Sequence, residues 1–191
     1  MADELTNLQR AIDGFGARLR LVGDDQWALP TPCSEWTVRE LANHVVNGGY
    51  MAERMLGGAT ADEVVASFDP DALGASPVAA FEASSAAEGE AFAEPGALDR
   101  VVHHPGAGDV PGSMLLAFRI GDNLLHAWDL ARACGFDETL DADAVAATWA
   151  ALEPMAPMIP SIGVFGSGPS GSVGADAPIQ VRLLDLSGRR P

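Results

Sequence analysis

Three residues on two segments of this sequence carry side chains that bind metal ions. In the stretch GDNLLHAWDLARACG, Asp122 and His126 lie four residues apart, and His44 lies in the earlier stretch LANHVV. Residues four apart on a helix share one face. Two imidazoles and one carboxylate bind a first-row divalent ion and leave coordination positions open for water or substrate. If the two segments meet, they form an open metal site of the catalytic type.

Both segments have the pattern of amphipathic helices. Thr37 offers an N-cap hydroxyl with Glu40 three residues later, and apolar residues follow in helical register to about residue 57. The segment 113–133 predicts a second long helix that stops at Gly135. Side chains on facing helices build sites inside helical bundles. We therefore expect His44, Asp122 and His126 to converge between these two helices.

The remaining segments complete an all-α fold. Further helices are expected at 4–22, 77–94 and 141–152, with a connection at 59–76 and a long loop at 95–111 that holds an extended piece at Val101 and Val102. The end of the chain, about 160–191, is rich in Gly, Ser and Pro and predicts an irregular tail packed on the bundle, with one apolar run at 181–186. We expect one domain over residues 1–191, a four-helix bundle with an additional C-terminal helix.

Composition excludes several classes of partner. The 191 residues hold 11 Lys and Arg against 27 Asp and Glu, a net charge of −16 that repels nucleic acid and anionic membranes. No stretch is long and apolar enough for a membrane span, and the start MADELTNLQR lacks the pattern of a secretory signal. A cytoplasmic protein with reduced cysteines is expected, and whether it forms a homodimer stays open.

Three stretches resemble a known family: TPCSEWTVRELANHVV, PGSMLLAFRIGDNLLHAWDLARACG and ADAPIQVRLLDLSGRRP. They are similar to the actinobacterial metal-binding proteins related to the mycothiol-dependent maleylpyruvate isomerase N-terminal domain, within the DinB-like superfamily. The resemblance implies a DinB-like four-helix bundle with one His on the second helix and an acidic residue plus His on a later helix as metal ligands. By position these are His44, Asp122 and His126. The acidic position is often Glu in the isomerase and is Asp122 here.

The resemblance also implies a function. Family members with activity use the metal to bind a small thiol such as mycothiol, so it implies a metal- and thiol-dependent transferase or isomerase that acts on small electrophilic molecules. Zinc is the first choice of metal, with nickel, iron and manganese as alternatives. Two other hypotheses stay open: a non-catalytic metal-binding bundle with a stress or sensing role, and a metal-free interaction module in which Asp122 and His126 form a buried polar pair. No residue is assigned a catalytic role.

Several neighbouring residues have two interpretations each. Asp129 either accepts a hydrogen bond from a ligand imidazole or pairs with Arg132, and Arg119 either binds a substrate carboxylate or neutralises Asp122. Other candidates are expected mainly in structural roles: core packing for Trp36 and Trp128, small buried groups for Cys33 and Cys134, and a solvated loop for His103 and His104.

Overall fold

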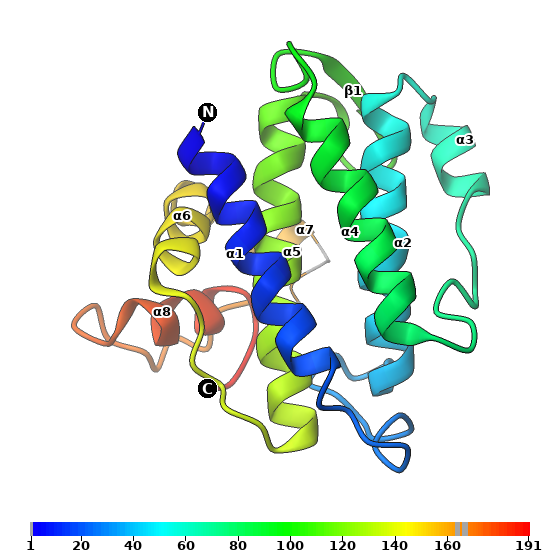
Figure 1. Cartoon of the computed structure of the whole chain (residues 1–191). Helices are drawn as coiled ribbons and strands as arrows, with labels where there is room; N and C mark the ends of the chain where they lie inside the picture. Colours follow the sequence, from blue (N-terminus) through cyan, green and yellow to red (C-terminus); the bar gives the residue numbers. More distant parts are fainter. Residues whose placement is uncertain (1, 163–164, 166–167) are drawn as a thin grey trace.

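The apolar stripe at the start of the chain forms α1 (Ala2–Leu19), which buries Leu8, Phe15 and Leu19. The computed structural model describes residues 2–162, 165 and 168–191. Three more long helices complete a four-helix bundle (Figure 1): α2 (Val38–Leu56), α4 (Pro77–Ala93) and α5 (Gly112–Cys134). Helices α1 and α2 each contact both α4 and α5. The predicted all-α bundle is confirmed.

Local signals fix where the two site-bearing helices begin and end. Thr37 caps α2 in a capping box with Glu40, so that each side chain binds a backbone N–H of the other residue. Gly135 ends α5 in the left-handed conformation, with a φ of 73°, which a residue without a Cβ adopts without strain. These boundaries lie within two residues of those predicted from the sequence.

A second group of helices covers one side of α5. The predicted additional helix is α6 (Ala142–Leu152), capped by Asp141 and packed on α1 and α5. It is followed by the short 3-10 helix η1 (Glu153–Met155), α7 (Ile159–Ile162) and α8 (Ile179–Leu186), which packs on α6. The sequence placed the apolar run at 181–186 in an irregular tail, and the structure forms α8 there. Parts of the predicted domain and tail, residues 1, 163–164 and 166–167, lie outside the described residues.

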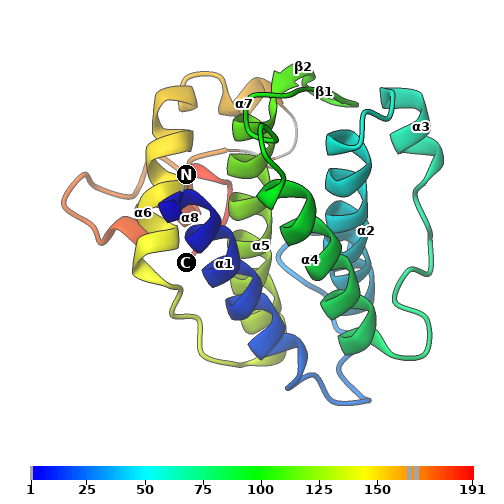
Figure 2. The ribbon, with the colours of Figure 1, turned by 45° about the horizontal axis from the view of Figure 1, so that its top comes forward.

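The loop predicted at 95–111 contains a small hairpin. Strands β1 (Val101–His104) and β2 (Gly108–Pro111) pair antiparallel, with Val102 opposite Val110, both buried. Gly108, the first residue of β2, has a φ of 72°, in the left-handed region that glycine adopts without strain. The expected extended piece at Val101 and Val102 is therefore one strand of a pair. The hairpin lies beside the first turns of α5 (Figure 2).

The connection between α2 and α4 follows the surface of α2. It holds α3 (Ala61–Ala66), and the amides of Asn43 and Asn47 bind the backbone of Asp69 and Leu73 beyond it. Together, α3 and this connection lie on the opposite side of the bundle from α6 and α8 (Figure 2). Among the described residues, none of the helices has the length and apolar character needed to cross a lipid bilayer.

Candidate metal centre

His44 on α2 and Asp122 and His126 on α5 lie together. Oδ1 of Asp122 is 3.1 Å from Nε2 of His44 and 3.2 Å from Nε2 of His126. One ligand atom from each residue lies within 4.8 Å of the other two. The side chains of His44 and Asp122 are 37% and 23% exposed, whereas His126 is buried at 9%. The structure thus brings the three predicted residues into one cluster that is open to solvent on the His44 side.

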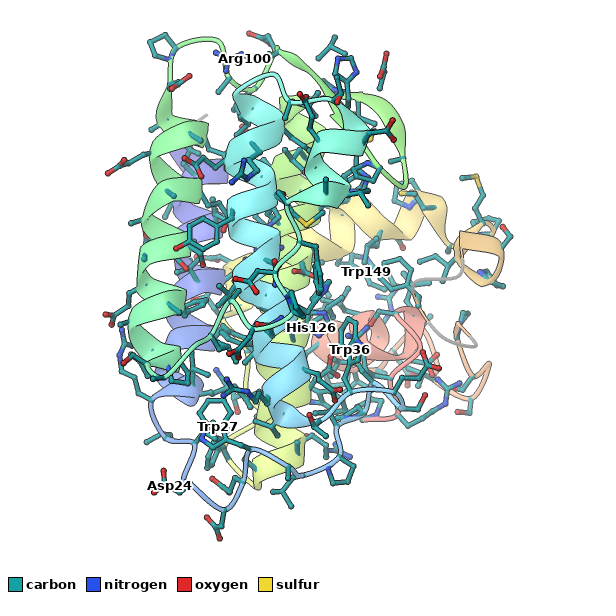
Figure 3. The ribbon with its side chains drawn as sticks, turned by 90° about the vertical axis from the view of Figure 1, so that its right-hand side faces the viewer. Asp24, Trp27, Trp36, Arg100, His126 and Trp149 are labelled. Atoms are coloured by element: carbon teal, nitrogen blue, oxygen red, sulfur yellow. The ribbon has the colours of Figure 1, made fainter. Side chains whose placement is uncertain are left out.

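The cluster has the donors of an open metal site. Two imidazole nitrogens and one carboxylate oxygen lie within 4.8 Å of one another, and three protein ligands would leave at least one coordination position free on a tetrahedral ion. The ring of Trp36 lies over His44, with centroids 4.6 Å apart, and 5.7 Å from the ring of His126. Figure 3 shows Trp36 and His126 close together beside α2, with α8 farther back. Trp36 therefore forms part of the wall of the site, while its partly buried side chain also packs against the hydrophobic core as expected.

Arg119 holds the second oxygen of Asp122. Its Nη1 is 2.5 Å from Oδ2 of Asp122, and its Nε is 2.6 Å from Oε1 of Glu88 on α4. Arg119 and Glu88 are both buried. Burial opposes the charge on Arg119, but Glu88 and Asp122 raise its pKa above the usual value. Of the two predicted roles, the structure shows the neutralisation of Asp122, and the guanidinium is not free to bind a substrate carboxylate.

A glycine on α2 makes room for this arginine. Gly48 lies one helical turn after His44, and a Cβ atom at Gly48 would overlap Nη1 of Arg119. Arg119 also donates through Nη2 to the backbone carbonyl of Val45, at 3.3 Å. Because the arginine packs directly on the backbone of α2, the two helices approach closely where they carry the candidate ligands.

The other face of His126 contacts a second carboxylate. Its Nδ1 is 2.9 Å from Oδ2 of Asp129, which is fully buried and is bound in turn by Arg189 at 2.6 and 3.1 Å. Burial raises the pKa of Asp129, but the hydrogen bond from His126 and the charge of Arg189 lower it to about 2. For His126, burial acts in the other direction and lowers the pKa, but Asp122 and Asp129 raise it well above the usual value. Asp129 thus binds the imidazole, while Arg132 pairs with Glu138 instead.

A second group of possible ligands shares His126. Sγ of Cys33 lies 3.5 Å from Oδ2 of Asp129, so that Cys33, His126 and Asp129 could also surround an ion. However, Arg189 already donates to both oxygens of Asp129. A cation there would have to displace this bidentate guanidinium from Asp129, or bind beside it against the repulsion of its positive charge. The group with His44 and Asp122 is therefore the better candidate for a metal site.

The other predicted candidates lie away from the centre or in the core. Trp128 is buried at 1% exposure, as expected for a core residue. His103 pairs with Asp109 on the hairpin, and His104 packs against Phe118. Cys33 and Cys134 are both free thiols and only partly buried, and burial raises the pKa of Cys134. Cys33 alone of the two contacts the cluster.

Two residues of the centre were not found from the sequence. Glu88 had a signal, because it lies seven residues after Phe81 and four before Phe92 and so falls on the buried stripe of α4. A carboxylate on such a stripe requires a cationic partner. Arg189 had no comparable signal, since it lies 60 residues from Asp129 in a segment without long-range periodicity.

Fold and cluster together define a helical-bundle protein with a candidate three-ligand centre between α2 and α5. Residues 8–131 match the family described as the mycothiol maleylpyruvate isomerase N-terminal domain, and the chain belongs to this family. It is also 42% identical, over 139 residues, to uncharacterized proteins from two strains of Mycobacterium tuberculosis, covering 73% of this chain and 71% of theirs. No solved structure gives a significant match. The family resemblance predicted from the sequence is confirmed.

Proposed function

We propose that the protein binds a divalent metal ion through His44, Asp122 and His126 and works as a thiol-dependent transferase or isomerase on small electrophilic molecules. The observation that carries the proposal is the placement of three ligand atoms within 4.8 Å of one another at a partly exposed position. The family to which the chain belongs is described by a mycothiol-dependent isomerase, which supports mycothiol as the thiol. Zinc is the first choice of ion, because two nitrogens and one oxygen with an open position suit it.

The residues around the ligands prepare them for this role. Arg119 engages Oδ2 of Asp122, which leaves Oδ1 to face the two imidazoles. Asp129 accepts a hydrogen bond from Nδ1–H of His126, so that when His126 gives up a proton to bind an ion, Nε2 is the nitrogen that carries the lone pair. His44, the most exposed of the three, forms the side by which a ligand would enter. Asp122 and His126 are therefore each oriented by a contact on the side away from the shared position.

The charge of the centre suits an anionic sulfur. With neutral histidines, the buried and half-buried groups carry one more negative than positive charge: Glu88, Asp122 and Asp129 against Arg119 and Arg189. A divalent ion bound there would leave the centre with a single net positive charge and would stabilise a thiol as its thiolate, the nucleophilic form. The free thiols Cys33 and Cys134 are in keeping with the reducing cytoplasm, where such small thiols are found, and we propose that location.

The test compares two histidines that contact carboxylates in the same way. His44 and His103 lie 3.1 and 2.7 Å from an aspartate, and both are partly exposed, but only His44 is in the cluster. Full-length protein without a histidine tag is titrated with zinc, and bound metal is measured by elemental analysis. We expect one ion per chain in the parent and in His103→Gln, and weakened binding in His44→Gln and Asp122→Asn. Equal binding in all four proteins would contradict the proposed ligands.

Catalysis is tested on the same proteins. The metal-loaded parent is incubated with mycothiol and a chromogenic electrophile, and the rate is compared with those of His44→Gln and His103→Gln. Turnover in the parent and in His103→Gln that His44→Gln lacks would support the enzyme. Stoichiometric binding without any turnover, across several thiols and electrophiles, would instead favour a non-catalytic metal-binding bundle.

A further inference from the structure

The C-terminal segment reaches the centre through one arginine. Arg189 follows α8, and its Nε and Nη2 lie 3.1 and 2.6 Å from Oδ1 and Oδ2 of Asp129. Asp129 is fully buried, and the side chain of Arg189 is only 10% exposed. The guanidinium therefore engages both oxygens of the carboxylate in the paired geometry that arginine makes and lysine cannot.

Asp129, held in this way, in turn restricts the orientation of the His126 imidazole. Oδ2 of Asp129 lies 2.9 Å from Nδ1 of His126, on the opposite side of the ring from Asp122. A carboxylate that is bound at both oxygens by a planar guanidinium has little freedom to rotate about its own axis. The direction of the Nδ1 hydrogen bond, and with it the direction of Nε2, is set by where Arg189 holds Asp129.

The segment that carries Arg189 is itself anchored. Leu183, Leu184 and Leu186 on α8 are buried. The backbone N–H of Arg189 donates to the carbonyl of Leu184 at 2.8 Å, and its Nη1 donates to the carbonyl of Ser187 at 3.0 Å. The guanidinium is thus held by its own chain segment as well as by Asp129. This support is needed if Arg189 is to set the orientation of Asp129.

We propose that Arg189 is a positioning residue for the metal centre: by holding Asp129, it aims Nε2 of His126 at the shared ligand position without touching the ion. The C-terminal segment then contributes to metal affinity from a part of the chain that lies beyond the family match at 8–131. The metal part of this inference rests on the proposed function. The orientation of His126 does not, because it can be observed without any metal.

The test uses full-length Arg189→Gln and Arg189→Lys, with Arg182→Gln as the control. Arg182 lies on α8, stacks on Trp149 and approaches Glu153, so its loss perturbs the same segment away from the centre. The first readout is the proton NMR signal of Nδ1–H of His126 in metal-free protein, assigned by its absence in His126→Gln. We expect this slowly exchanging signal in the parent and in Arg182→Gln, a shifted signal in Arg189→Lys, and a broadened or lost signal in Arg189→Gln.

The second readout is zinc affinity, measured by competition with a chelator. Contacts that orient a metal ligand are typically worth about 10- to 100-fold in affinity, so we expect about a 10-fold loss in Arg189→Gln, a smaller loss in Arg189→Lys and none in Arg182→Gln. If Arg189→Gln is less stable but keeps the parent's signal and affinity, Arg189 only neutralises a buried charge and the inference is overturned.

The experiment also gives a decision in two further cases. If Arg189→Gln does not fold, Arg189→Lys decides, and a lysine variant with an unchanged signal and unchanged affinity overturns the inference. If the parent binds no zinc but the Nδ1–H signal still depends on Arg189, the proposed function fails and the positioning role stands.

Discussion

Nη1 of Arg119 lies 2.5 Å from Oδ2 of Asp122, one turn along the same helix. The two oxygens of this carboxylate therefore have different partners: Oδ2 accepts from the arginine, and Oδ1 contacts the imidazoles of His44 and His126. The arginine is buried and is also bound by Glu88, so its position does not depend on a ligand in the centre. The candidate acidic ligand is therefore oriented before any ion binds.

The closeness of Arg119 to α2 makes Gly48 sensitive to substitution. In Gly48→Ala, the new methyl group overlaps a guanidinium that cannot move without breaking its contacts to Glu88 and Asp122. Overpacking of this kind costs about 1–3 kcal/mol, and we expect weaker zinc binding as well, because Asp122 loses its support. Chemical denaturation and zinc titration measure the two effects.

Gly89 on α4 provides the matched control. A Cβ atom there meets nothing within 4 Å, so Gly89→Ala should be neutral or stabilising by up to about 1 kcal/mol, the gain in helix propensity. If Gly48→Ala behaves like Gly89→Ala in both measurements, Arg119 is not confined as described.

Metal binding should release a proton from His126. Burial lowers the pKa of His126, but Asp122 and Asp129 raise it well above its usual value, so the metal-free protein holds His126 protonated at neutral pH. An ion on Nε2 displaces that proton, while Nδ1 keeps its hydrogen bond to Asp129. We expect at least one proton per zinc in weakly buffered solution at pH 7, and an affinity that rises with pH up to the raised pKa.

Zinc affinity is expected to rise with pH, whereas the stability of the metal-free protein should fall with pH because of the same proton on His126. A group whose pKa is higher in the folded chain than in the unfolded chain stabilises the fold fully below its unfolded value, about 6.5 for histidine. That contribution is lost as the pH rises through the raised pKa. Thus Tm in chelator should fall above about pH 6.5 while the increase in Tm caused by zinc grows. A zinc effect that shrinks with pH would count against this protonation scheme.

The helices were predictable because their signals are local. Thr37 with Glu40, Asp141 and Gly135 mark helix ends, and the apolar periodicity of α1 and α2 shows which faces are buried. The eight residues of α8 and the four-residue strands of the hairpin are too short for periodicity to separate helix, strand and loop. The structure of α8 depends on its contacts with α6, and that of the hairpin on the pairing of its two strands. A single sequence reveals neither set of contacts.

The centre was predictable to the extent that its residues share a helix. Asp122 and His126 lie one turn apart, and the expected packing of the two helices, supported by the resemblance to the family, joined them to His44 across 78 residues of sequence. The structure brings the three side chains together, and their role as metal ligands stays a prediction. Asp129 was a candidate partner of the imidazole on helical spacing alone, whereas Arg189 approaches it only because α8 folds back onto the bundle.

Trp36 should report on the metal centre by fluorescence. Its ring centroid is 4.6 Å from that of His44, so a paramagnetic ion bound there, such as Ni²⁺ or Co²⁺, should quench its emission. Trp36→Phe should lose most of the quenching that these ions cause in the parent. Trp149→Phe, which removes the ring that stacks with Arg182, should keep it. Quenching that survives in Trp36→Phe and disappears in Trp149→Phe would place the ion elsewhere.

The buried pair of Glu88 and Arg119 should dominate the stability effects of charge removal. Glu88→Gln leaves a guanidinium that is only 7% exposed with Asp122 as its remaining charged partner. Breaking a buried pair by removing one partner costs about 3–5 kcal/mol, and because the contact with Asp122 remains, we expect a loss of about 3 kcal/mol. The control is Glu82, which lies on the same helix six residues before Glu88 and forms an exposed pair with Arg20. Glu82→Gln should cost under about 1 kcal/mol. Urea unfolding of both variants makes the comparison, and equal losses would show that the polar contacts between α4 and α5 do not support the centre.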